Sequence, residues 1–289
     1  MTNKAKTIKF IVSDMDGTLF EGHRETIFDL SLRNEEALKK IKDSNIEFCV
    51  SSGRMVDFGI QLLKKYGFSK IRVAGFNGAV CSDCGKIVST LPIPYSTLSK
   101  IIPIIKTKYS SEFRSLQLQT LTSERLFLPN DESSIQSYQK DIDRLGIGRI
   151  SKTTIDDYLK DPKDTMIGKL SFYMPSKDRS IQAINDLRSA TSDGSIFITM
   201  SSDTLVEIVN PNAGKDNFVS YLRKTYNLSK DEIAVIGDAP NDRKMFSESN
   251  FRFAMASGDE SLKSDADFIV NDVAECIDYC INYNKGKVE

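Results

Sequence analysis

The chain has 289 residues and a formal net charge of −1, from 39 basic and 40 acidic side chains. Its length suggests about two domains, and 40% hydrophobic with 27% charged residues is typical of a globular protein. The balanced charge disfavours a broadly basic nucleic-acid binder, and no apolar run approaches the ~20 residues that span a bilayer. Since its start also shows no signal-peptide pattern, we expect a cytoplasmic protein.

The first part of the chain alternates short apolar strands with amphipathic helices. We predict strands at 9–13, 47–51 and 71–74, and helices at 32–44 and 55–66. The alternation returns after Asn210-Pro211, with helices at 215–226, 241–249, 261–264 and 274–283 and strands at 233–236, 251–254 and 268–270. This order predicts an α/β fold with a doubly wound, Rossmann-like parallel sheet that carries helices on both faces.

The middle of the chain has a different pattern. A turn centred on Gly85 predicts a hairpin over 81–88, and strands then come in adjacent pairs at 113–120 with 124–128 and at 195–200 with 205–209. A further strand at 167–174 and helices at 131–145, 154–160 and 177–190 complete the region. We therefore expect an inserted α+β domain over 82–204, within a core formed by 1–81 and 205–289.

The cysteines and the histidine limit the possible chemistry. Five cysteines, an odd number, argue against a secreted disulfide framework. Cys81 and Cys84 form a CxxC, which we interpret as a turn between two short strands; a zinc or redox module is the alternative. The single histidine, His23, excludes a mechanism that needs one histidine as base and another as metal ligand.

Four polar segments are expected where strands end or helices begin. They are Asp14-Met15-Asp16-Gly17-Thr18, Ser51-Ser52-Gly53-Arg54, Asn212 to Asn217 with Lys215, and Gly237 to Asp242. Each alone has an ordinary interpretation as a cap or turn. In an open α/β sheet, however, ligands bind at the carboxyl ends of the strands. Together the segments supply carboxylates for a divalent cation and a lysine and hydroxyl for a dianion, a combination that suits phosphoryl transfer.

At these residues the sequence resembles the haloacid dehalogenase superfamily of phosphohydrolases, and within it the Cof-type branch that carries a large α/β cap. The resemblance covers essentially the whole chain, although the cap matches in layout rather than in motif. It implies a HAD-like core and a cap that acts as a lid and selects the substrate. It also implies a Mg²⁺-dependent phosphatase that acts through an aspartyl-phosphate.

The resemblance implies a role for each matching residue. Asp14 would be the nucleophile, Asp16 the general acid and then base, Ser52 a phosphoryl ligand, and Lys215 the balancing cation. Mg²⁺ would be held by Asp14, the Asp16 carbonyl and Asp238, with Asp242 supporting its shell. The remaining matches are assigned to substrate or phosphate binding: Gly53, Arg54, Asn77 and Asn241.

Two features depart from the family pattern. Lys215 is followed by Asp216 where this branch often has glycine, and the stretch between Thr18 and Ser31 is longer than usual. That stretch holds His23 and Arg24, which we interpret as solvated loop residues, with contact to a substrate as the alternative.

The expected partner is a small phosphorylated metabolite, either a sugar phosphate or a phosphorylated cofactor, while oligomeric partners stay unknown. A phosphomutase or phosphotransferase of the same fold and a catalytically idle sugar-phosphate-binding module are the competing functions. The intact Asp14 and Asp16 pair weighs against the binding module.

Overall fold

The computed structural model describes residues 6–20, 29–191, 194, 196–200 and 202–287. The chain divides into two compact units, which we call the core unit (Met1–Val88 and Gly214–Glu289) and the insert unit (Ser89–Ala213). Among the described residues, no helix is both long enough and apolar enough to cross a membrane.

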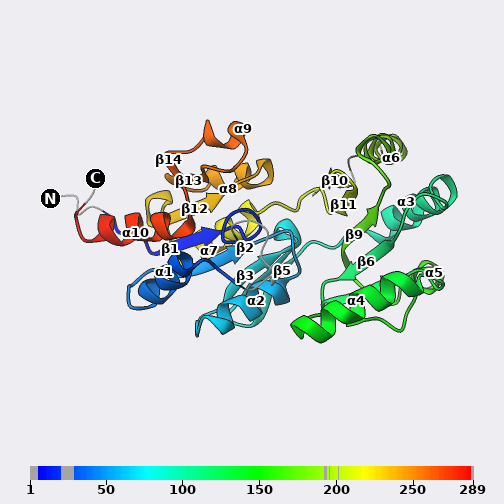
Figure 1. The fold of residues 1–289 in the computed structure, drawn as a ribbon, viewed down its shortest axis with the longest axis horizontal. Helices are drawn as coiled ribbons and strands as arrows, with labels where there is room; N and C mark the ends of the chain where they lie inside the picture. Colours follow the sequence, from blue (N-terminus) through cyan, green and yellow to red (C-terminus); the bar gives the residue numbers. More distant parts are fainter. Residues whose placement is uncertain (1–5, 21–28, 192–193, 195, 201, 288–289) are drawn as a thin grey trace. The chain divides into compact units, whose positions relative to one another are not determined.

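The core unit is built on an eight-stranded sheet of order β14-β13-β12-β1-β2-β3-β4-β5 (Figure 1). Its neighbouring pairs from β14 to β3 are parallel, and β4 then runs antiparallel to β3. The strands are β1 (Phe10–Ser13), β2 (Glu47–Ser51), β3 (Arg72–Gly75), β4 (Val80–Asp83), β5 (Lys86–Thr90), β12 (Ile233–Gly237), β13 (Phe251–Met255) and β14 (Phe268–Val270). The predicted doubly wound parallel sheet is confirmed.

The central strands of this sheet are buried because helices cover both of its faces. Phe10 and Val12 of β1 pack with Phe218 and Leu222 of α7, while α1 and α10 lie side by side on the core unit (Figure 1). The helices and short 3-10 turns are α1 (Leu32–Lys42), α2 (Val56–Lys65), η1 (Phe76–Gly78), α7 (Asp216–Thr225), η2 (Lys230–Glu232), η3 (Pro240–Asp242), α8 (Arg243–Phe246), α9 (Glu260–Lys263) and α10 (Val273–Asn284).

The insert unit has its own six-stranded sheet, of order β10-β11-β9-β6-β7-β8. Every neighbouring pair is antiparallel except β7 with β8. The strands are β6 (Leu116–Thr120), β7 (Glu124–Phe127), β8 (Arg149–Ile150), β9 (Ile167–Tyr173), β10 (Phe197–Met200) and β11 (Leu205–Val209). The helices are α3 (Tyr95–Lys108), α4 (Glu132–Leu145), α5 (Ile155–Lys160) and α6 (Lys177–Ala190).

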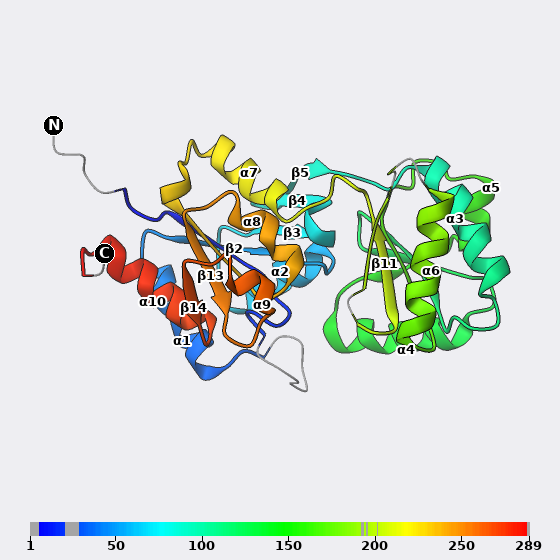
Figure 2. The ribbon, with the colours of Figure 1, turned by 90° about the horizontal axis from the view of Figure 1, so that it is seen from above.

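The two faces of this second sheet differ in chemistry. Leu118 and Leu170 lie in the same buried apolar cluster as Ile101 of α3 and Leu187 of α6, and Figure 2 shows these two helices together beside β11. Because side chains alternate along a strand, the residues between them point to the other face. Those residues are polar yet buried: Gln117, Gln119, Lys169, Ser171 and Glu207.

Several details differ from the sequence-based expectation, and three of them concern the domain limits and the helices. The predicted domain limits, 82 and 204, lie short of the limits between the units, because β4 and most of β5 extend the core sheet and β11 pairs within the insert sheet. The helix expected over 241–249 is shorter, a 3-10 turn followed by α8. Helix α3 was not predicted at all, because Pro103 interrupts its pattern.

Candidate active site

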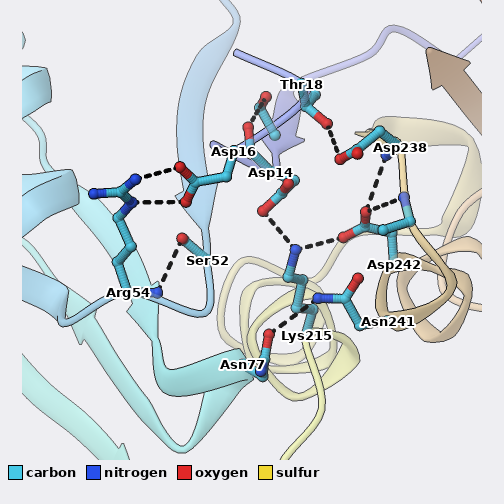
Figure 3. Close-up of polar contacts among 12 residues, drawn as sticks. Asp14, Asp16, Thr18, Ser52, Arg54, Asn77, Lys215, Asp238, Asn241 and Asp242 are labelled. Atoms are coloured by element: carbon cyan, nitrogen blue, oxygen red, sulfur yellow. Dashed lines mark hydrogen bonds and ion pairs between the residues drawn. The ribbon is translucent and has the colours of Figure 1, made fainter. Parts of the chain in front are cut away.

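The four polar segments converge at the carboxyl ends of neighbouring strands. Asp14 follows β1, Ser52 follows β2 and Asp238 follows β12, and β1 lies between the other two strands. The register pairs Ser13 with Ile236 on one side and with Val50 on the other, and the Asp14 N–H donates to the Ile236 carbonyl at 3.0 Å. Figure 3 shows the side chains from these strand ends directed toward one another, with Lys215 from the start of α7 among them.

Lys215 forms the centre of this arrangement. Its side chain is 1% exposed, and its Nζ lies 2.5 Å from Asp14 Oδ1 and 2.5 Å from Asp242 Oδ1 (Figure 3). Burying an ammonium is costly unless charged acceptors replace the lost water. The two carboxylates supply that replacement, so the lysine holds both of them at a fixed separation.

Asp242 is itself fixed by the backbone. Its Oδ2 accepts hydrogen bonds from the N–H groups of Asp238 at 3.0 Å and Ala239 at 3.1 Å, as a side chain does when it caps a turn. Both of its oxygens are thus engaged, one by these amides and one by Lys215. These contacts fix the Asp242 carboxylate beside Asp14 and Asp238.

Asp238 has two neighbours in the loop that follows β1. Thr18 Oγ1 donates to Asp238 Oδ1 at 2.9 Å. Gly17 has a φ of +84°, and a Cβ there would lie 2.3 Å from Asp238 Oδ2, so only glycine fits this close approach. Neither contact with Asp238 could be predicted from the sequence, because Asp238 lies more than two hundred positions away and no local pattern reports it.

The charges at this site do not balance. Asp14, Asp238 and Asp242 offer oxygens within 4.8 Å of one another, whereas Lys215 is the one cation hydrogen-bonded to this cluster among the described residues. Burial raises the pKa of Asp14 well above its usual range, against the opposing pull of Lys215, and Asp242 and Asp238 add to the increase. Burial and then Asp242 raise the pKa of Asp238. Burial disfavours charged Lys215, but Asp14 and Asp242 together outweigh it and raise its pKa.

This donor set fits a divalent cation. Carboxylate oxygens are the ligands that hard cations such as Mg²⁺ take, and three carboxylates against one ammonium leave an excess of two negative charges if all are ionised. Asp14 and Asp238 are the side chains placed to bind the ion. The Asp16 carboxylate does not belong to this cluster, so its contribution would be the carbonyl that the family resemblance assigns.

The Asp16 side chain instead pairs with Arg54. Arg54 Nε donates to Asp16 Oδ2 at 2.7 Å and Nη2 donates to Oδ1 at 2.5 Å, a bidentate contact between the loop after β1 and the loop after β2. The Arg54 N–H donates to Ser52 Oγ at 3.1 Å. Because Ser52 accepts there, its own hydroxyl hydrogen is left to donate elsewhere.

Asn77 and Asn241 lie next to each other and close to Lys215 in Figure 3. Asn241 Nδ2 donates to Asn77 Oδ1 at 3.2 Å, and a Cβ on Gly53 would lie 3.4 Å from the same Asn77 oxygen. The structure thus brings together every residue that the sequence assigned to catalysis, to phosphate binding or to the metal. Their individual roles remain predictions.

We expect Gly78→Ala to destabilise the protein and to reduce its activity. Gly78 has a φ of +83°, and a Cβ there would lie 2.0 Å from the carbonyl oxygen of Gly214, the residue before Lys215. The left-handed conformation alone costs an alanine roughly 1–2 kcal/mol. The clash with backbone adds to this and displaces Lys215, so the total should exceed ~2 kcal/mol in urea unfolding.

Gly85→Ala is the matched control for this substitution. Gly85 has nearly the same φ, +82°, but in the described part of the chain nothing lies within 4 Å of the added Cβ. It should show only the conformational cost and keep full activity. Equal losses in the two variants would contradict the role of the contact with Gly214.

Other residues that the sequence singled out lie elsewhere. His23 and Arg24 are outside the described residues. Cys81 is buried in β4 and Cys84 is exposed at the turn before β5, so the interpretation of this CxxC as a turn is confirmed. No other group of three or more possible ligands was found within the described ranges, and the zinc alternative therefore has no support.

The fold and the site define an α/β hydrolytic enzyme with an inserted second unit, and comparisons with known proteins agree. The family model for haloacid dehalogenase-like hydrolases matches residues 11–276. A 5-amino-6-(5-phospho-D-ribitylamino)uracil phosphatase of Bacillus subtilis is 24% identical, over 95% of this chain and 99% of the relative. A phosphoglycolate phosphatase of Sulfolobus acidocaldarius is 25% identical, over 92% of this chain and 91% of the relative.

A solved structure shows the same fold. A haloacid dehalogenase-like hydrolase from Bacteroides thetaiotaomicron superposes with a TM-score of 0.77 at 21% identity, covering 94% of this chain and 99% of that one. The chain therefore belongs to the haloacid dehalogenase-like hydrolase family, and it is a phosphatase.

Proposed function

We propose that this phosphatase depends on Mg²⁺ and hydrolyses small phosphorylated metabolites, either sugar phosphates or phosphorylated cofactors, through an aspartyl-phosphate on Asp14. The observation that supports this most strongly is the buried cluster in which Lys215 contacts Asp14 and Asp242 while Asp238 lies beside them. A cluster with excess negative charge suits a site that gains a cation together with its substrate.

In the first half of the reaction, a carboxylate oxygen of Asp14 attacks phosphorus and the bond to the leaving oxygen breaks. A carboxylate approaches a phosphate dianion only when the repulsion between them is cancelled. Lys215, 2.5 Å from Asp14, supplies part of that cancellation, and the Ser52 hydroxyl is available to donate to a phosphoryl oxygen. Mg²⁺ bound by Asp14 and Asp238 would supply the rest by neutralising charge on the phosphoryl oxygens.

Asp16 serves both halves of the reaction in this proposal. It first gives its proton to the leaving oxygen and then, as a carboxylate, takes a proton from the water that attacks the aspartyl-phosphate. Phosphate leaves and Asp14 is restored as a free carboxylate. The bidentate contact with Arg54 fixes the direction of the Asp16 side chain in the resting protein.

The assay that tests this proposal measures phosphate release from p-nitrophenyl phosphate and from a panel of sugar phosphates and phosphorylated cofactors. We expect release in Mg²⁺, none in EDTA, and recovery when Mg²⁺ is returned. Members of the panel should differ in kcat/KM, since we propose that the insert unit selects the substrate. If the folded wild type releases phosphate from no member in Mg²⁺, the proposed substrate classes and the proposed dependence on Mg²⁺ are contradicted.

A further inference from the structure

The insert unit carries a polar pocket of its own. It has a volume of about 310 Å³, at the lower end of the range for small-molecule sites, and all its lining residues belong to the insert unit. Strand β6 supplies Gln117, strand β7 supplies Arg125, and the first turns of α4 supply three serines and Tyr138. Arg114, just before β6, lines the same pocket.

Arg125 lacks an ion-pair partner among the described residues. No carboxylate within the described part of the chain forms an ion pair with it, and its buried Nε has no hydrogen-bond partner there. Burial lowers the pKa of Arg125, and the opposing effects of Tyr138, Tyr173 and Asp141 do not cancel it. Arg125 as a whole is half-buried, but a buried N–H of a cation that lacks an acceptor is costly, and an anionic ligand would supply one.

The structure nevertheless holds Arg125 in a defined position. Its Nη1 donates to Gln117 Oε1 at 2.8 Å, and Gln117 Nε2 donates in turn to Ser115 Oγ at 3.0 Å. The guanidinium also lies over the ring of Tyr138, with 4.0 Å between its carbon and the ring centroid. A planar guanidinium group fixed in this way is suited to bind two oxygens of an oxyanion.

The other charged side chains that line the pocket also favour the binding of an anion. Arg114 is exposed, forms no ion pair with a described residue, and lies over the ring of Tyr173 at 5.7 Å. The lining includes one carboxylate, Asp141, which pairs with Arg144 at 3.0 Å. The pocket therefore presents two guanidinium groups and several hydroxyls against one carboxylate.

We propose that this pocket, built on Arg125 and Arg114, is an oxyanion-binding site that takes a carboxylate or phosphate group of a small molecule. Nothing in the proposed reaction uses these residues. The site can be tested in EDTA, which removes the divalent cation that would attract an anion to Asp14, so that the Arg125 and Arg114 variants report on the insert unit.

The experiment is calorimetric titration of the full chain in EDTA with inorganic phosphate and, separately, with malonate. The wild type should bind at least one of them, and Arg125→Gln should weaken that binding about 10- to 100-fold, the range for losing a charge-assisted hydrogen-bonding partner. Arg125→Lys, which keeps the charge, should lose less. Arg188→Gln, an exposed arginine on α6 of the same unit, is the matched control and should bind as the wild type does.

Two further readouts separate a binding role from a structural one. Phosphate or malonate should raise the Tm of the wild type but not that of Arg125→Gln, since only a bound ligand stabilises the folded state in this way. Arg114→Gln changes an exposed side chain, so it should fold normally and still weaken binding. The proposal would be overturned if the wild type bound neither anion. It would also be overturned if folded Arg125→Gln and Arg114→Gln bound as tightly as the wild type.

Kinetic measurements in Mg²⁺ then distinguish the sources of the anion. If the pocket holds a second anionic group of the substrate, Arg125→Gln should raise KM for 3-phosphoglycerate or fructose 1,6-bisphosphate and leave p-nitrophenyl phosphate unaffected. If KM is unchanged for all three while binding in EDTA is lost, the pocket holds a separate anion. Both results support the site, and neither depends on the identity of the nucleophile.

Discussion

Asp14→Asn should reduce Mg²⁺-dependent phosphate release on the order of 10⁴-fold or more, the scale on which hydrolases lose activity without their nucleophile. An amide is a far weaker nucleophile toward phosphorus than a carboxylate, and it also binds a divalent cation less strongly. Asparagine has nearly the same shape, so the hydrogen bond to Lys215 and the strand end keep their geometry. The measurement is the steady-state rate on p-nitrophenyl phosphate in Mg²⁺.

The same variant should not lose stability in EDTA. The raised pKa of Asp14 in the folded state means that folding disfavours its carboxylate form, so the native carboxylate destabilises the protein above the pKa of an unfolded aspartate. Asparagine removes that penalty, and Tm at neutral pH should stay equal or rise. Asp43→Asn, at the exposed end of α1, is the control and should change neither activity nor Tm. A large fall in the Tm of Asp14→Asn would mean that Asp14 is needed for folding, and its loss of activity would then say little about catalysis.

Lys215→Met should have the opposite effect on stability. Its removal leaves Asp14 and Asp242 buried together without their shared cation, and breaking a buried pair in this way costs about 3–5 kcal/mol. Because its neighbours raise the pKa of Lys215, the lysine stays charged and stabilising through neutral pH. We expect this loss in urea unfolding in EDTA, and partial recovery in Mg²⁺. Activity should fall about 10²- to 10³-fold, as when one charge-stabilising donor is removed.

The control for this variant is Lys224→Met, an exposed lysine in the last turn of the same helix. Exposed substitutions of this kind usually change stability by less than ~0.5 kcal/mol. If Lys215→Met in EDTA is as stable as the wild type, then Lys215 does not neutralise ionised carboxylates, and the charge balance described for the site is wrong.

The main features of the core could be predicted because they depend on local signals. The apolar runs before Asp14 and Ser52 mark buried strands, and parallel strands bring their carboxyl ends to one edge. Helix α3 has an equally local signal, with Leu98, Ile101 and Ile105 at helical spacing and all buried, but Pro103 hides it. Its presence shows that packing outweighed the cost of proline.

Other features depend on partners that are distant in the sequence and could not be predicted. Thr18 binds Asp238 across 220 positions, and only the sheet order places them together. The family resemblance implied that Asp242 supports the metal shell, but its contacts with Lys215 and two backbone amides could be found only in the structure. The side chain of Arg125 resembles any exposed sheet residue until the structure shows that its Nε is buried without a partner.

The most direct test of the account is to trap the phosphorylated nucleophile. Borohydride reduces a mixed anhydride of a carboxylic acid and phosphoric acid to the alcohol, so an aspartyl-phosphate at Asp14 becomes homoserine. Asp16→Asn should accumulate this species from p-nitrophenyl phosphate, because nitrophenolate leaves without a proton while the attacking water lacks its base. The readout is mass spectrometry of the peptide that contains residue 14.

The account predicts homoserine at position 14 in Asp16→Asn treated with substrate, Mg²⁺ and borohydride. It predicts none when EDTA replaces Mg²⁺, and none when Asp14→Asn is added to the variant. Unmodified Asp14 in a protein that still releases nitrophenolate under these conditions would contradict the covalent route and the assignment of Asp14 as the nucleophile.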